Sequence, residues 1–416
     1  KLLRKTSDLF DKGVNGPMYS DIKSVQALIV LLKEYGVRKI VLSPGMRNVP
    51  IIHSVEQDDF FQCYSMVDER SAAYFAMGLA QESGETVAIC CTSGTAAVNY
   101  SPAVYEAFFQ KVPLVVITAA RNPQYLYQLE DQCVPQSHLY DGVCKKSVTL
   151  PIVKDDIDYW YCIRILNEAF MELNHNGKGP IHINVPIEHG IVSFNTGELP
   201  PLTAIKRTIL AKCTAEEKEA LKKKLKSYKR ILLIYGQSLP ASESKKILVE
   251  NFVSNYNCVV AVEHISNLKC KGTVNIYLAC NVLTNDVFEK FAPDLVISME
   301  GQFLSSLRYL LIDCRKKFEY WCVNETGTVV DPLRKLTHVF EGNSEEFFEF
   351  FKGCENANAF ENEYLKLWNE RLERLKKVKQ YGFPFSNNYA IQKIMQNVPK
   401  GVLMHFGTDT IVRLSQ

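Results

Sequence analysis

Residues 86–110, TVAICCTSGTAAVNYSPAVYEAFFQ, decide the fold of this chain. The run TVAICCT at 86–92 is short and apolar, as in a strand that is buried on both faces. The turn TSGT at 92–95 follows, and residues 94–110 have the apolar spacing of a helix. The run LVVITA at 114–119 then predicts a second strand. A strand, a helix and a strand in this order predict two parallel strands joined by a helical crossover.

The same alternation extends over most of the chain. Further strands are expected at 39–43, 60–67 and 180–186, and further helices at 49–56, 69–82 and 160–173. A second series of strands is expected at 231–235, 258–262, 295–299 and 320–323. The capping box Thr214-Ala-Glu-Glu217 predicts the helix that opens this second series. We therefore expect an α/β protein with two doubly wound parallel-sheet domains and the start of a third.

Breaks in the alternation predict the domain boundaries. Residues 187–213 contain glycines and prolines without a clear period, as in a linker between domains. We expect a first domain at 19–190, a linker at 191–213, a central domain at 214–355, a helical connector at 356–386 and the beginning of a third domain at 387–416. This last segment is expected to hold a helix at 388–396 and a strand at 401–406.

Composition excludes several classes of protein. The 416 residues carry a net charge of +2, so there is no basic surplus to hold a nucleic acid or an anionic membrane. The longest apolar runs are much shorter than the about 20 residues that span a bilayer. The 13 cysteines include no C-x-x-C pair. We therefore expect reduced thiols in a cytoplasmic protein rather than disulfides or a zinc site.

Polar residues follow four predicted strands of the first domain. They are SPGMR at 43–47, DER at 68–70, TSGT at 92–95 and RNP at 121–123. Ligands of open parallel sheets bind beyond the carboxyl ends of the strands, so these segments are candidates for a site. Alternatives stay open at this point. Arg47 is either a solvated arginine or the partner of an anion. Glu69 is either a helix N-terminal charge or a proton-handling group.

Other binding motifs are absent from the sequence. It lacks G-x-G-x-x-G, a Walker A loop and a G-x-S-x-G elbow. These absences argue against a dinucleotide site, a P-loop and an α/β-hydrolase site, respectively.

Seven segments together resemble one family. They are SPGMRNVP at 43–50, VDERSAA at 67–73, TSGTAAVN at 92–99, ITAARNP at 117–123, GPIHINVP at 179–186, EYW at 319–321 and GTDTIVR at 407–413. In this order they resemble the 2-succinyl-5-enolpyruvyl-6-hydroxy-3-cyclohexene-1-carboxylate synthases of menaquinone biosynthesis. The resemblance implies a thiamine-diphosphate-binding fold. Its first domain binds the aminopyrimidine ring, its central domain is largely structural, and its third domain binds the diphosphate through Mg²⁺.

The resemblance also implies roles for single residues. Glu69 matches the catalytic glutamate that shares a proton with N1′ of the pyrimidine ring. The residues implied to bind the cofactor are Pro44, Glu69, Thr92, Ser93, Gly94, Thr95 and Asn99. Those implied to bind substrate are Arg47, Arg121, Gln132, Arg308 and Arg413. Arginine suits this task because its planar guanidinium binds a carboxylate with two parallel hydrogen bonds.

The family reaction removes CO₂ from 2-oxoglutarate and adds the succinic semialdehyde unit to isochorismate. The resemblance therefore implies a thiamine-diphosphate-dependent carboligase. Three positions depart from the family pattern. Met46 and Asp409 stand where serine is usual, and Leu307 stands where lysine is usual. These departures leave open a divergent enzyme that acts on another 2-oxo acid.

The metal and the assembly are also implied by the resemblance. The family's Mg²⁺ motif begins with Gly-Asp, and this sequence contains no Gly-Asp dipeptide. We therefore expect no metal ligand within this chain, and the Mg²⁺ ligands are expected in a further C-terminal domain. A chain that is incomplete for activity and a non-catalytic paralogue with a scaffolding or regulatory role both stay open. A homodimer or homotetramer is implied, because different subunits hold the two ends of the cofactor.

Overall fold

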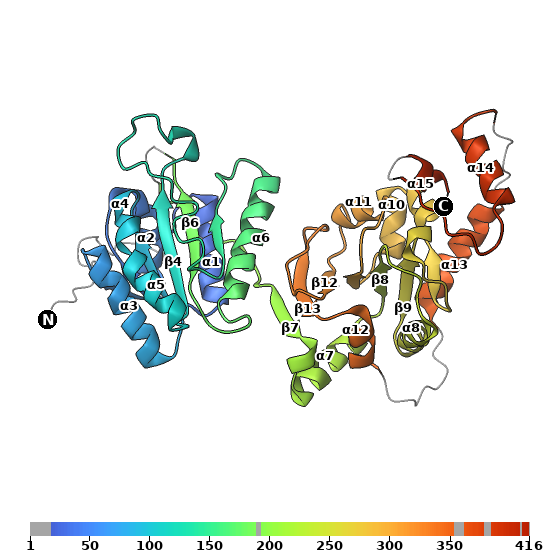
Figure 1. Ribbon diagram of the computed structural model, residues 1–416, viewed down its shortest axis with the longest axis horizontal. Helices are drawn as coiled ribbons and strands as arrows, with labels where there is room; N and C mark the ends of the chain where they lie inside the picture. The colour runs from blue at the N-terminus through green and yellow to red at the C-terminus, as the bar shows by residue number, and fades with distance from the viewer. Residues whose placement is uncertain (1–17, 189–192, 353–361, 378–383, 408–409, 416) are drawn as a thin grey trace. The chain divides into compact units, whose positions relative to one another are not determined.

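The computed structural model describes residues 18–188, 193–352, 362–377, 384–407 and 410–415 (Figure 1). The chain divides into two units, Lys1–Ile205 (unit 1) and Lys206–Gln416 (unit 2), and the division falls within the segment 191–213. Each unit is built around one parallel sheet with helices beside it. The prediction of two doubly wound parallel-sheet domains is therefore confirmed.

In the described part of unit 1, six parallel strands form one sheet in the order β2-β1-β3-β4-β6-β5. The strands are β1 (Lys39–Leu42), β2 (Gln62–Ser65), β3 (Val87–Cys91), β4 (Leu114–Ala120), β5 (Ser147–Thr149) and β6 (Ile181–Pro186). The helices are α1 (Lys23–Glu34), α2 (Val49–Glu56), α3 (Glu69–Ser83), α4 (Thr95–Asn99), α5 (Ser101–Phe109) and α6 (Asp156–Glu172).

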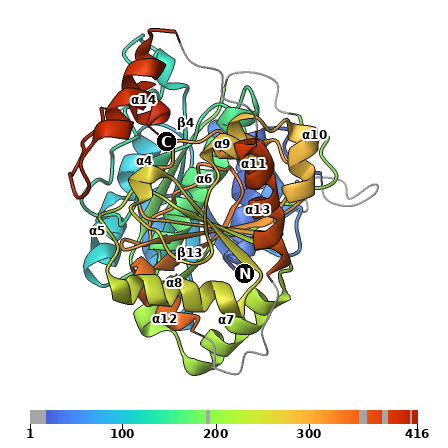
Figure 2. The ribbon, with the colours of Figure 1, turned by 90° about the vertical axis from the view of Figure 1, so that its right-hand side faces the viewer.

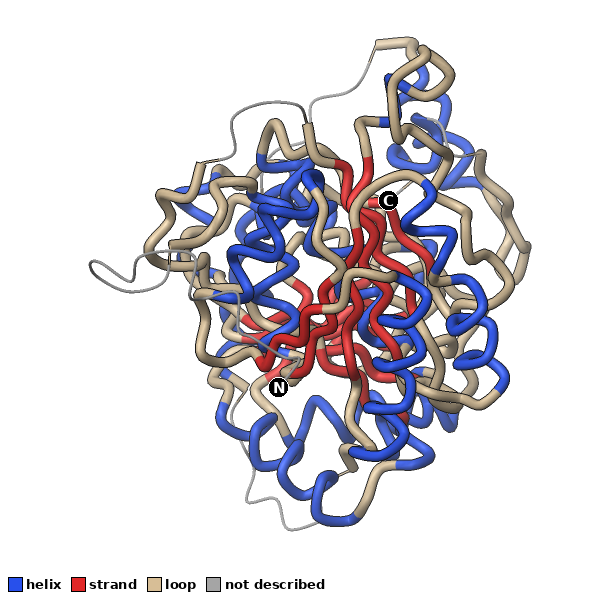
Figure 3. Tube along the Cα trace, turned by 90° about the vertical axis from the view of Figure 1, so that its left-hand side faces the viewer, coloured by secondary structure: helices blue, strands red, loops and turns tan. Residues whose placement is uncertain are grey.

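Side chains of these strands alternate between two apolar cores. Ile40 and Leu42 of β1 pack against α1, α2 and α6, whereas Val41 packs against α3, α4 and α5. Figure 3 shows the strands between the two layers of helices. The adjacent Cys90 and Cys91 of β3 belong to opposite cores, because successive residues of a strand face opposite ways. Both are free thiols, and burial raises the pKa of Cys90 to about 12.

Local signals explain the ends of α3 and the break between α4 and α5. Asp68 is the N-cap of α3 and accepts a hydrogen bond from the Ser71 amide at 2.8 Å. Gly84 ends α3 in the left-handed region, with φ of 70°. The helix predicted over 94–110 is in fact two helices that meet at Tyr100. Pro102 accounts for the break, because its ring opposes a continuous helix.

In the described part of unit 2, seven parallel strands form one sheet in the order β10-β9-β8-β11-β12-β13-β7. The strands are β7 (Lys206–Ile209), β8 (Ile231–Tyr235), β9 (Cys258–Val262), β10 (Thr273–Asn275), β11 (Leu295–Met299), β12 (Glu319–Asn324) and β13 (Leu336–Glu341). The helices are α7 (Ala215–Ser227), α8 (Glu243–Asn255), α9 (Tyr277–Asn281), α10 (Asn285–Phe288), α11 (Leu307–Ile312), α12 (Ser344–Phe350), α13 (Glu363–Lys376), α14 (Asn387–Asn397) and α15 (Thr410–Leu414).

Helices also cover both faces of this second sheet. Figure 2 shows α7, α8 and α12 on one side of the strands and α11 and α13 on the other. The capping box predicted at the start of α7 is confirmed. Thr214 Oγ1 accepts from the Glu217 amide at 3.2 Å, and Glu217 Oε2 accepts from the Thr214 amide at 2.9 Å. No helix in the described ranges is both long and apolar enough to cross a membrane.

Two expectations about short segments differ from the structure. Residues 206–209, placed in the linker by their sequence, form β7 and pair with β13 at the edge of the second sheet. The strand expected at 401–406 is wrong, because these residues have no regular secondary structure. A strand is stable only beside a hydrogen-bonded neighbour, and none of the described strands pairs with this segment.

Candidate cofactor and substrate site

The four polar segments predicted from the sequence lie on neighbouring strands of unit 1. The order β2-β1-β3-β4 places residues 68–70, 43–47, 92–95 and 121–123 one after another at the carboxyl edge of the sheet. The boundary between β1 and β3 is also the switch point, because the chain continues from β1 to β2 on one side and from β3 to β4 on the other. Ligands of doubly wound sheets bind at such a switch point.

The turn after β1 is held against the turn after β3. A Cβ at Gly45 would overlap the side chain of Thr92, so only glycine allows this approach. Thr92 Oγ1 accepts from the Arg47 amide at 3.2 Å. Asn48, which is buried, accepts from the Gly45 amide at 2.9 Å and donates to the Ser43 carbonyl at 2.9 Å. Pro44 is left exposed at the tip of the turn.

The TSGT turn contains a buried hydroxyl group without a partner. Ser93 is 1% exposed, and its Oγ makes no hydrogen bond within the described residues. Gly94 has φ of +86°, which favours glycine, and its amide donates inward to Gln136 Oε1 at 3.0 Å. Thr95 is exposed as the first residue of α4. A buried polar atom without a partner destabilises the fold, so Ser93 Oγ marks this turn as a place for a ligand.

Glu69 is the first residue of α3, directly beyond β2, and its side chain is half-buried. Its charge reaches the end of β3. The pKa of Cys91, the residue before the turn, is raised by burial first, then by Cys90, and also by Glu69. The structure thus brings the predicted carboxylate toward the turn that contains Ser93.

Arg121 follows β4 and is buried. It forms ion pairs with Glu130, at 3.4 Å between Nη1 and Oε2, and with Asp131. Its loop returns to the turn after β3 through Gln132. The backbone of Gln132 is left-handed, with φ of 49°, and its Cβ lies 3.1 Å from where a Cβ on Gly94 would be. The structure therefore brings Arg121, Gln132 and the TSGT turn together.

Arg47 lies close to this cluster. Its Nη1 donates to the carbonyl oxygens of Ile187 at 3.3 Å and Glu188 at 3.4 Å. The pKa of Arg47 is lowered by burial and then by the charge of Arg121, while Asp131 among others raises it. Two guanidinium groups thus act on each other at one end of the sheet, an arrangement that favours an anionic ligand.

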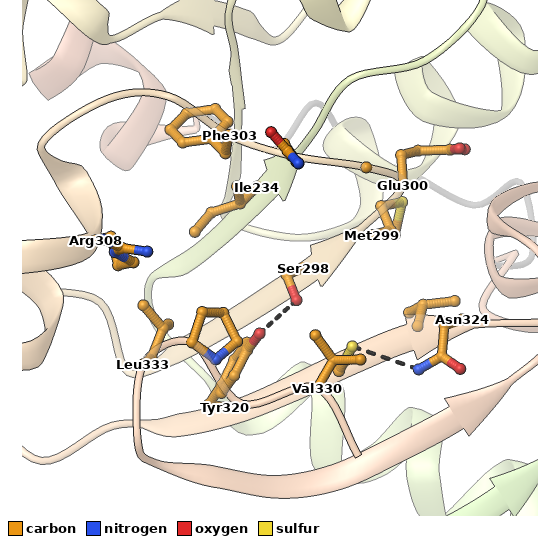
Figure 4. Close-up of a pocket in the computed structure, with 15 residues that line it drawn as sticks. Ile234, Ser298, Met299, Glu300, Phe303, Arg308, Tyr320, Asn324, Val330 and Leu333 are labelled. Carbon is orange, nitrogen blue, oxygen red and sulfur yellow. Dashed lines mark hydrogen bonds between the residues drawn. The ribbon is translucent and has the colours of Figure 1, made fainter. Parts of the chain in front are cut away.

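Asn99 and the two remaining arginines lie elsewhere. Asn99 is exposed at the far end of α4. Arg308 lies in unit 2, on α11, at one end of a cavity of about 540 Å³ beyond β8, β11 and β12 (Figure 4). Its Nη2 donates to Tyr309 Oη at 2.8 Å. Arg413 is exposed on α15, also in unit 2.

The charge of Arg413 acts on a buried carboxylate of unit 2, and the structure describes two of the three positions that depart from the family pattern. Burial raises the pKa of Glu263. Its hydrogen bonds with residues 304 and 305 and the charge of Arg413 act in the opposite direction and lower that pKa. Leu307, found where lysine is usual, is fully buried in unit 2, so an apolar residue suits this position. Met46 is 88% exposed, and Asp409 lies outside the described residues.

Comparisons with known proteins agree with this arrangement. Residues 22–140 match the family model described as "Thiamine pyrophosphate enzyme, N-terminal TPP binding domain". The 2-succinyl-5-enolpyruvyl-6-hydroxy-3-cyclohexene-1-carboxylate synthase of Bacteroides fragilis is 36% identical over 409 residues, which cover 96% of this chain and 71% of that protein. The enzymes with the same name from Bacteroides thetaiotaomicron and Porphyromonas gingivalis are 35% and 30% identical, with coverage of 96% of this chain and 71% and 70% of theirs.

The chain belongs to the 2-succinyl-5-enolpyruvyl-6-hydroxy-3-cyclohexene-1-carboxylate synthase family. The resemblance seen in the seven sequence segments is therefore confirmed. Unit 1 contains the thiamine-pyrophosphate-binding domain, and the matched residues 22–140 include β1 to β4 with all four strand ends.

Residues of this family member fit the pyrimidine end of thiamine diphosphate. The buried Ser93 hydroxyl has a hydrogen bond to give, and the half-buried Glu69 carboxylate is a polar group at the same edge of the sheet, with β1 between their strands. A polar ring against the turn would satisfy Ser93 Oγ. The Gly94 amide, in contrast, is already used within the protein by Gln136.

Sequence reasoning missed the residues that support the site. Asn48 and Gln136 are both buried and make the hydrogen bonds that fix the turns after β1 and β3. Asn48 stands within the segment 43–50 that resembles the family, but as an uncharged amide it does not by itself indicate a supporting role. Gln136 has no sequence signal, because its partners Gly94, Ala119 and Asn184 are between 17 and 48 residues away.

Proposed function

We propose that this protein is a 2-succinyl-5-enolpyruvyl-6-hydroxy-3-cyclohexene-1-carboxylate synthase of menaquinone biosynthesis. It decarboxylates 2-oxoglutarate and joins the remaining four-carbon unit to isochorismate. The observation that carries this proposal is the meeting of Glu69, the TSGT turn and the two arginines Arg47 and Arg121 on adjacent strand ends. Family membership supports it independently.

Thiamine diphosphate, when bound, supplies the electron sink for loss of CO₂ from a 2-oxo acid. In this proposal the Glu69 carboxyl group holds a proton against N1′ of the pyrimidine ring. Ser93 Oγ provides the hydrogen bond that it lacks in the protein alone. The other residues proposed to surround the ring are Pro44, Thr92, Gly94, Thr95 and Asn99. Gly94 acts there through its shape, because its amide is bonded to Gln136.

Arg47 and Arg121 are proposed to bind the substrate carboxylates. Their charges oppose each other, so an anion between them would relieve the repulsion. Asp131 and Glu130 partly neutralise Arg121, which limits this repulsion before substrate binds. Gln132 lies beside the turn and can hydrogen-bond a carboxylate or carbonyl oxygen. Arg308 and Arg413 of unit 2 are proposed as further substrate contacts.

Three further features belong to the proposal. Mg²⁺ is held by residues outside this chain's first two domains and binds the diphosphate. The working enzyme is a homodimer or homotetramer. Exposed aromatic side chains on α3 and α5 support this assembly: Tyr74, Phe75, Tyr105 and Phe109. The location is cytoplasmic, which the free thiols of the described cysteines support.

The test is an assay of the full-length protein with thiamine diphosphate, Mg²⁺, 2-oxoglutarate and isochorismate. We expect CO₂ release coupled to formation of the named product. Glu69→Gln should lower kcat by about 10²–10⁴-fold, the range for loss of a proton-transfer group. Glu82→Gln is the matched control, because Glu82 is exposed near the other end of the same helix, α3.

Two results would count against the proposal. Equal activities of Glu69→Gln and Glu82→Gln would remove the role of Glu69. Faster turnover of a different 2-oxo acid, such as pyruvate, would favour the divergent enzyme instead.

A further inference from the structure

The side-chain amide of Gln136 is buried beneath the turn after β3. Gln136 is 2% exposed and lies within a loop, not in a helix or strand. Its Oε1 accepts from the Gly94 amide at 3.0 Å. Its Nε2 donates to the Ala119 carbonyl at 3.0 Å and to Asn184 Oδ1 at 3.3 Å. One side chain thus joins the ends of three adjacent strands, β3, β4 and β6.

Further hydrogen bonds between side chains of β4 and β6 fix the position of Asn184, which accepts from Gln136. Asn184 Oδ1 also accepts from Thr118 Oγ1 at 3.0 Å, and Thr118 Oγ1 lies 2.8 Å from His182 Nε2. All three side chains are buried. Burial lowers the pKa of His182 to about 3, so this imidazole is neutral at physiological pH. The network therefore holds the amide in one orientation, with its oxygen toward Gly94.

Gln136 also ends the loop that contains Arg121 and Gln132. The loop leaves β4 at Arg121 and returns to the sheet at Gln136. Between them, Gln132 packs on Gly94 in a left-handed backbone conformation, which costs free energy and persists because the surrounding contacts enforce it. The hydrogen bond from Gly94 to Gln136 and the packing of Gln132 on Gly94 act on the same turn.

We propose that Gln136 is a positioning residue that fixes the position of the TSGT turn relative to the loop 121–136. It aligns the residues that face the cofactor, Ser93 above all, with Arg121 and Gln132, which face the substrate. This inference rests on the proposed function for what is aligned. The alignment itself rests only on the contacts of Gln136.

Two substitutions and a matched control test this role in the full-length enzyme. Gln136→Met keeps the length of the side chain and removes all three hydrogen bonds. In Gln136→Glu, the neutral carboxylic acid can still accept from Gly94 and donate to Ala119, whereas the carboxylate cannot donate. Asn167→Leu is the control. Asn167 is another buried amide of unit 1 with three hydrogen bonds, to Tyr35, Ile163 and Ile205, and it lies outside the site.

The first measurement is hydrogen–deuterium exchange of the protein without cofactor or substrate, read by mass spectrometry. In Gln136→Met, peptides that cover residues 92–100 and 121–136 should exchange at least tenfold faster than in wild type. In Asn167→Leu these peptides should keep their wild-type rates. Wild-type exchange in Gln136→Met would overturn the proposal.

The second measurement is kcat and KM for the 2-oxo acid. Gln136→Met should lower kcat/KM by about 10- to 100-fold, since small misplacements of reacting groups have effects of this size. Gln136→Glu should recover activity relative to wild type between pH 8 and pH 5.5, because burial raises the pKa of the introduced acid. If Gln136→Met does not fold, this pH-dependent recovery and the exchange of Gln136→Glu decide the question.

The outcomes separate the two proposals. An equal loss of kcat/KM in Asn167→Leu and Gln136→Met would mean that general destabilisation, not positioning, explains the effect. A wild-type enzyme that does not turn over 2-oxoglutarate would refute the proposed function. Hydrogen–deuterium exchange is measured without substrate, so its rates still decide the positioning role in that case.

Discussion

The two units of this chain have the same kind of sheet but differ at the switch point. In unit 2 the switch point lies between β8 and β11, and backbone hydrogen bonds join the two loops that follow. The Gln237 amide donates to the Gln302 carbonyl at 2.8 Å, and the Gly301 amide donates to the Gln237 carbonyl at 3.0 Å. In unit 1 the Ser43 amide donates to the Cys90 carbonyl at the strand ends, but beyond it the turns after β1 and β3 meet through a side chain, where Thr92 Oγ1 accepts from the Arg47 amide.

This difference shows how the same sheet topology can leave different groups available at its switch point. In unit 2 the backbone groups of the two loops bond to each other, so these groups are already used within the protein. In unit 1 the side chain of Thr92 makes the contact between the turns, and Ser93 Oγ has no partner among the described residues, so it remains for a ligand. The cavity of unit 2 lies beyond β8, β11 and β12, and Gly301 and Gln302 of the bonded loop form part of its lining (Figure 4).

Glycine variants at the two switch points test this comparison, and they should have the largest effects on the free energy of unfolding. A Cβ at Gly236 would overlap the Gly301 carbonyl, which the backbone holds in place, so Gly236→Ala should lower the free energy of unfolding by about 3 kcal/mol or more. A Cβ at Gly45 would overlap Thr92 Cβ, which no change of rotamer moves, so the turns must shift apart and Gly45→Ala should cost about 1–3 kcal/mol. Urea unfolding followed by circular dichroism measures both.

Calorimetry on the full-length protein separates the two variants further. Gly45→Ala should weaken thiamine diphosphate at least tenfold, because it moves the turn after β3. Gly236→Ala should leave the affinity of the folded protein unchanged. The comparison fails if Gly236→Ala weakens the cofactor as much as Gly45→Ala does.

Each unit contains a buried histidine, and these two histidines predict that the free energy of unfolding depends on pH. Burial lowers the pKa of His182 in unit 1 to about 3 and that of His338 in unit 2 to about 4. Each Nε2 lies 2.8 Å from a threonine hydroxyl, that of Thr118 or Thr208. Both imidazoles are neutral in the folded chain, whereas an unfolded histidine gains a proton below about pH 6.5.

The unfolded state therefore binds more protons than the folded state below pH 6.5, and the free energy of unfolding must fall as the pH falls. At pH 4.5 each histidine should cost about 2–3 kcal/mol relative to pH 7.5. His182→Gln and His338→Gln should each make the stability less sensitive to acid. Denaturant unfolding at several pH values measures this, and parallel curves for wild type and variants would contradict it.

The strands of the fold could be predicted because parallel strands are buried on both faces. Val87–Cys91 and Leu114–Ala120 are continuous apolar runs for this reason. The short edge strands β5, β7 and β10 gave no such signal, since three or four residues pair there only because a neighbouring strand is present. The strand expected at 401–406 is the reverse case, a strand-like run without a partner.

The site was predictable to a similar, limited extent. Its strand ends follow from the sheet, so Glu69, Arg47 and Arg121 could be chosen from the sequence. Asn48 bonds locally to Ser43 and Gly45, but Gln136 could not be chosen, because its partners are distant in sequence. No periodicity or spacing encodes a buried amide whose partners come from three different strands.

Serine variants sharpen the comparison with smaller effects. Ser298 of unit 2 lies 2.6 Å from the hydroxyl of the fully buried Tyr320, so Ser298→Ala should leave that hydroxyl without a partner and cost about 1–3 kcal/mol. Ser93 has no such partner among the described residues. Ser93→Ala should therefore leave the stability of the cofactor-free protein unchanged or slightly higher, yet weaken thiamine diphosphate.

Thermal unfolding with and without the cofactor measures both effects. We expect the cofactor to raise the Tm of Ser298→Ala as much as that of wild type, and to raise the Tm of Ser93→Ala less. A loss of stability in cofactor-free Ser93→Ala would show that its hydroxyl is already satisfied within the protein.

The smallest effect is expected at Met46, where the family usually has serine. Met46 is 88% exposed on the turn after β1, so Met46→Ser should change the free energy of unfolding by less than about 0.5 kcal/mol. Its neighbour Arg47 is proposed to bind substrate, so the same variant should act on KM for the 2-oxo acid while kcat stays within twofold. Leu307→Lys is the opposite case, because it buries a charge in unit 2 and should destabilise the fold strongly. If Met46→Ser changes neither KM nor the preferred 2-oxo acid, this departure from the family pattern has no part in substrate choice, and the exposed methionine belongs to a surface outside the substrate site.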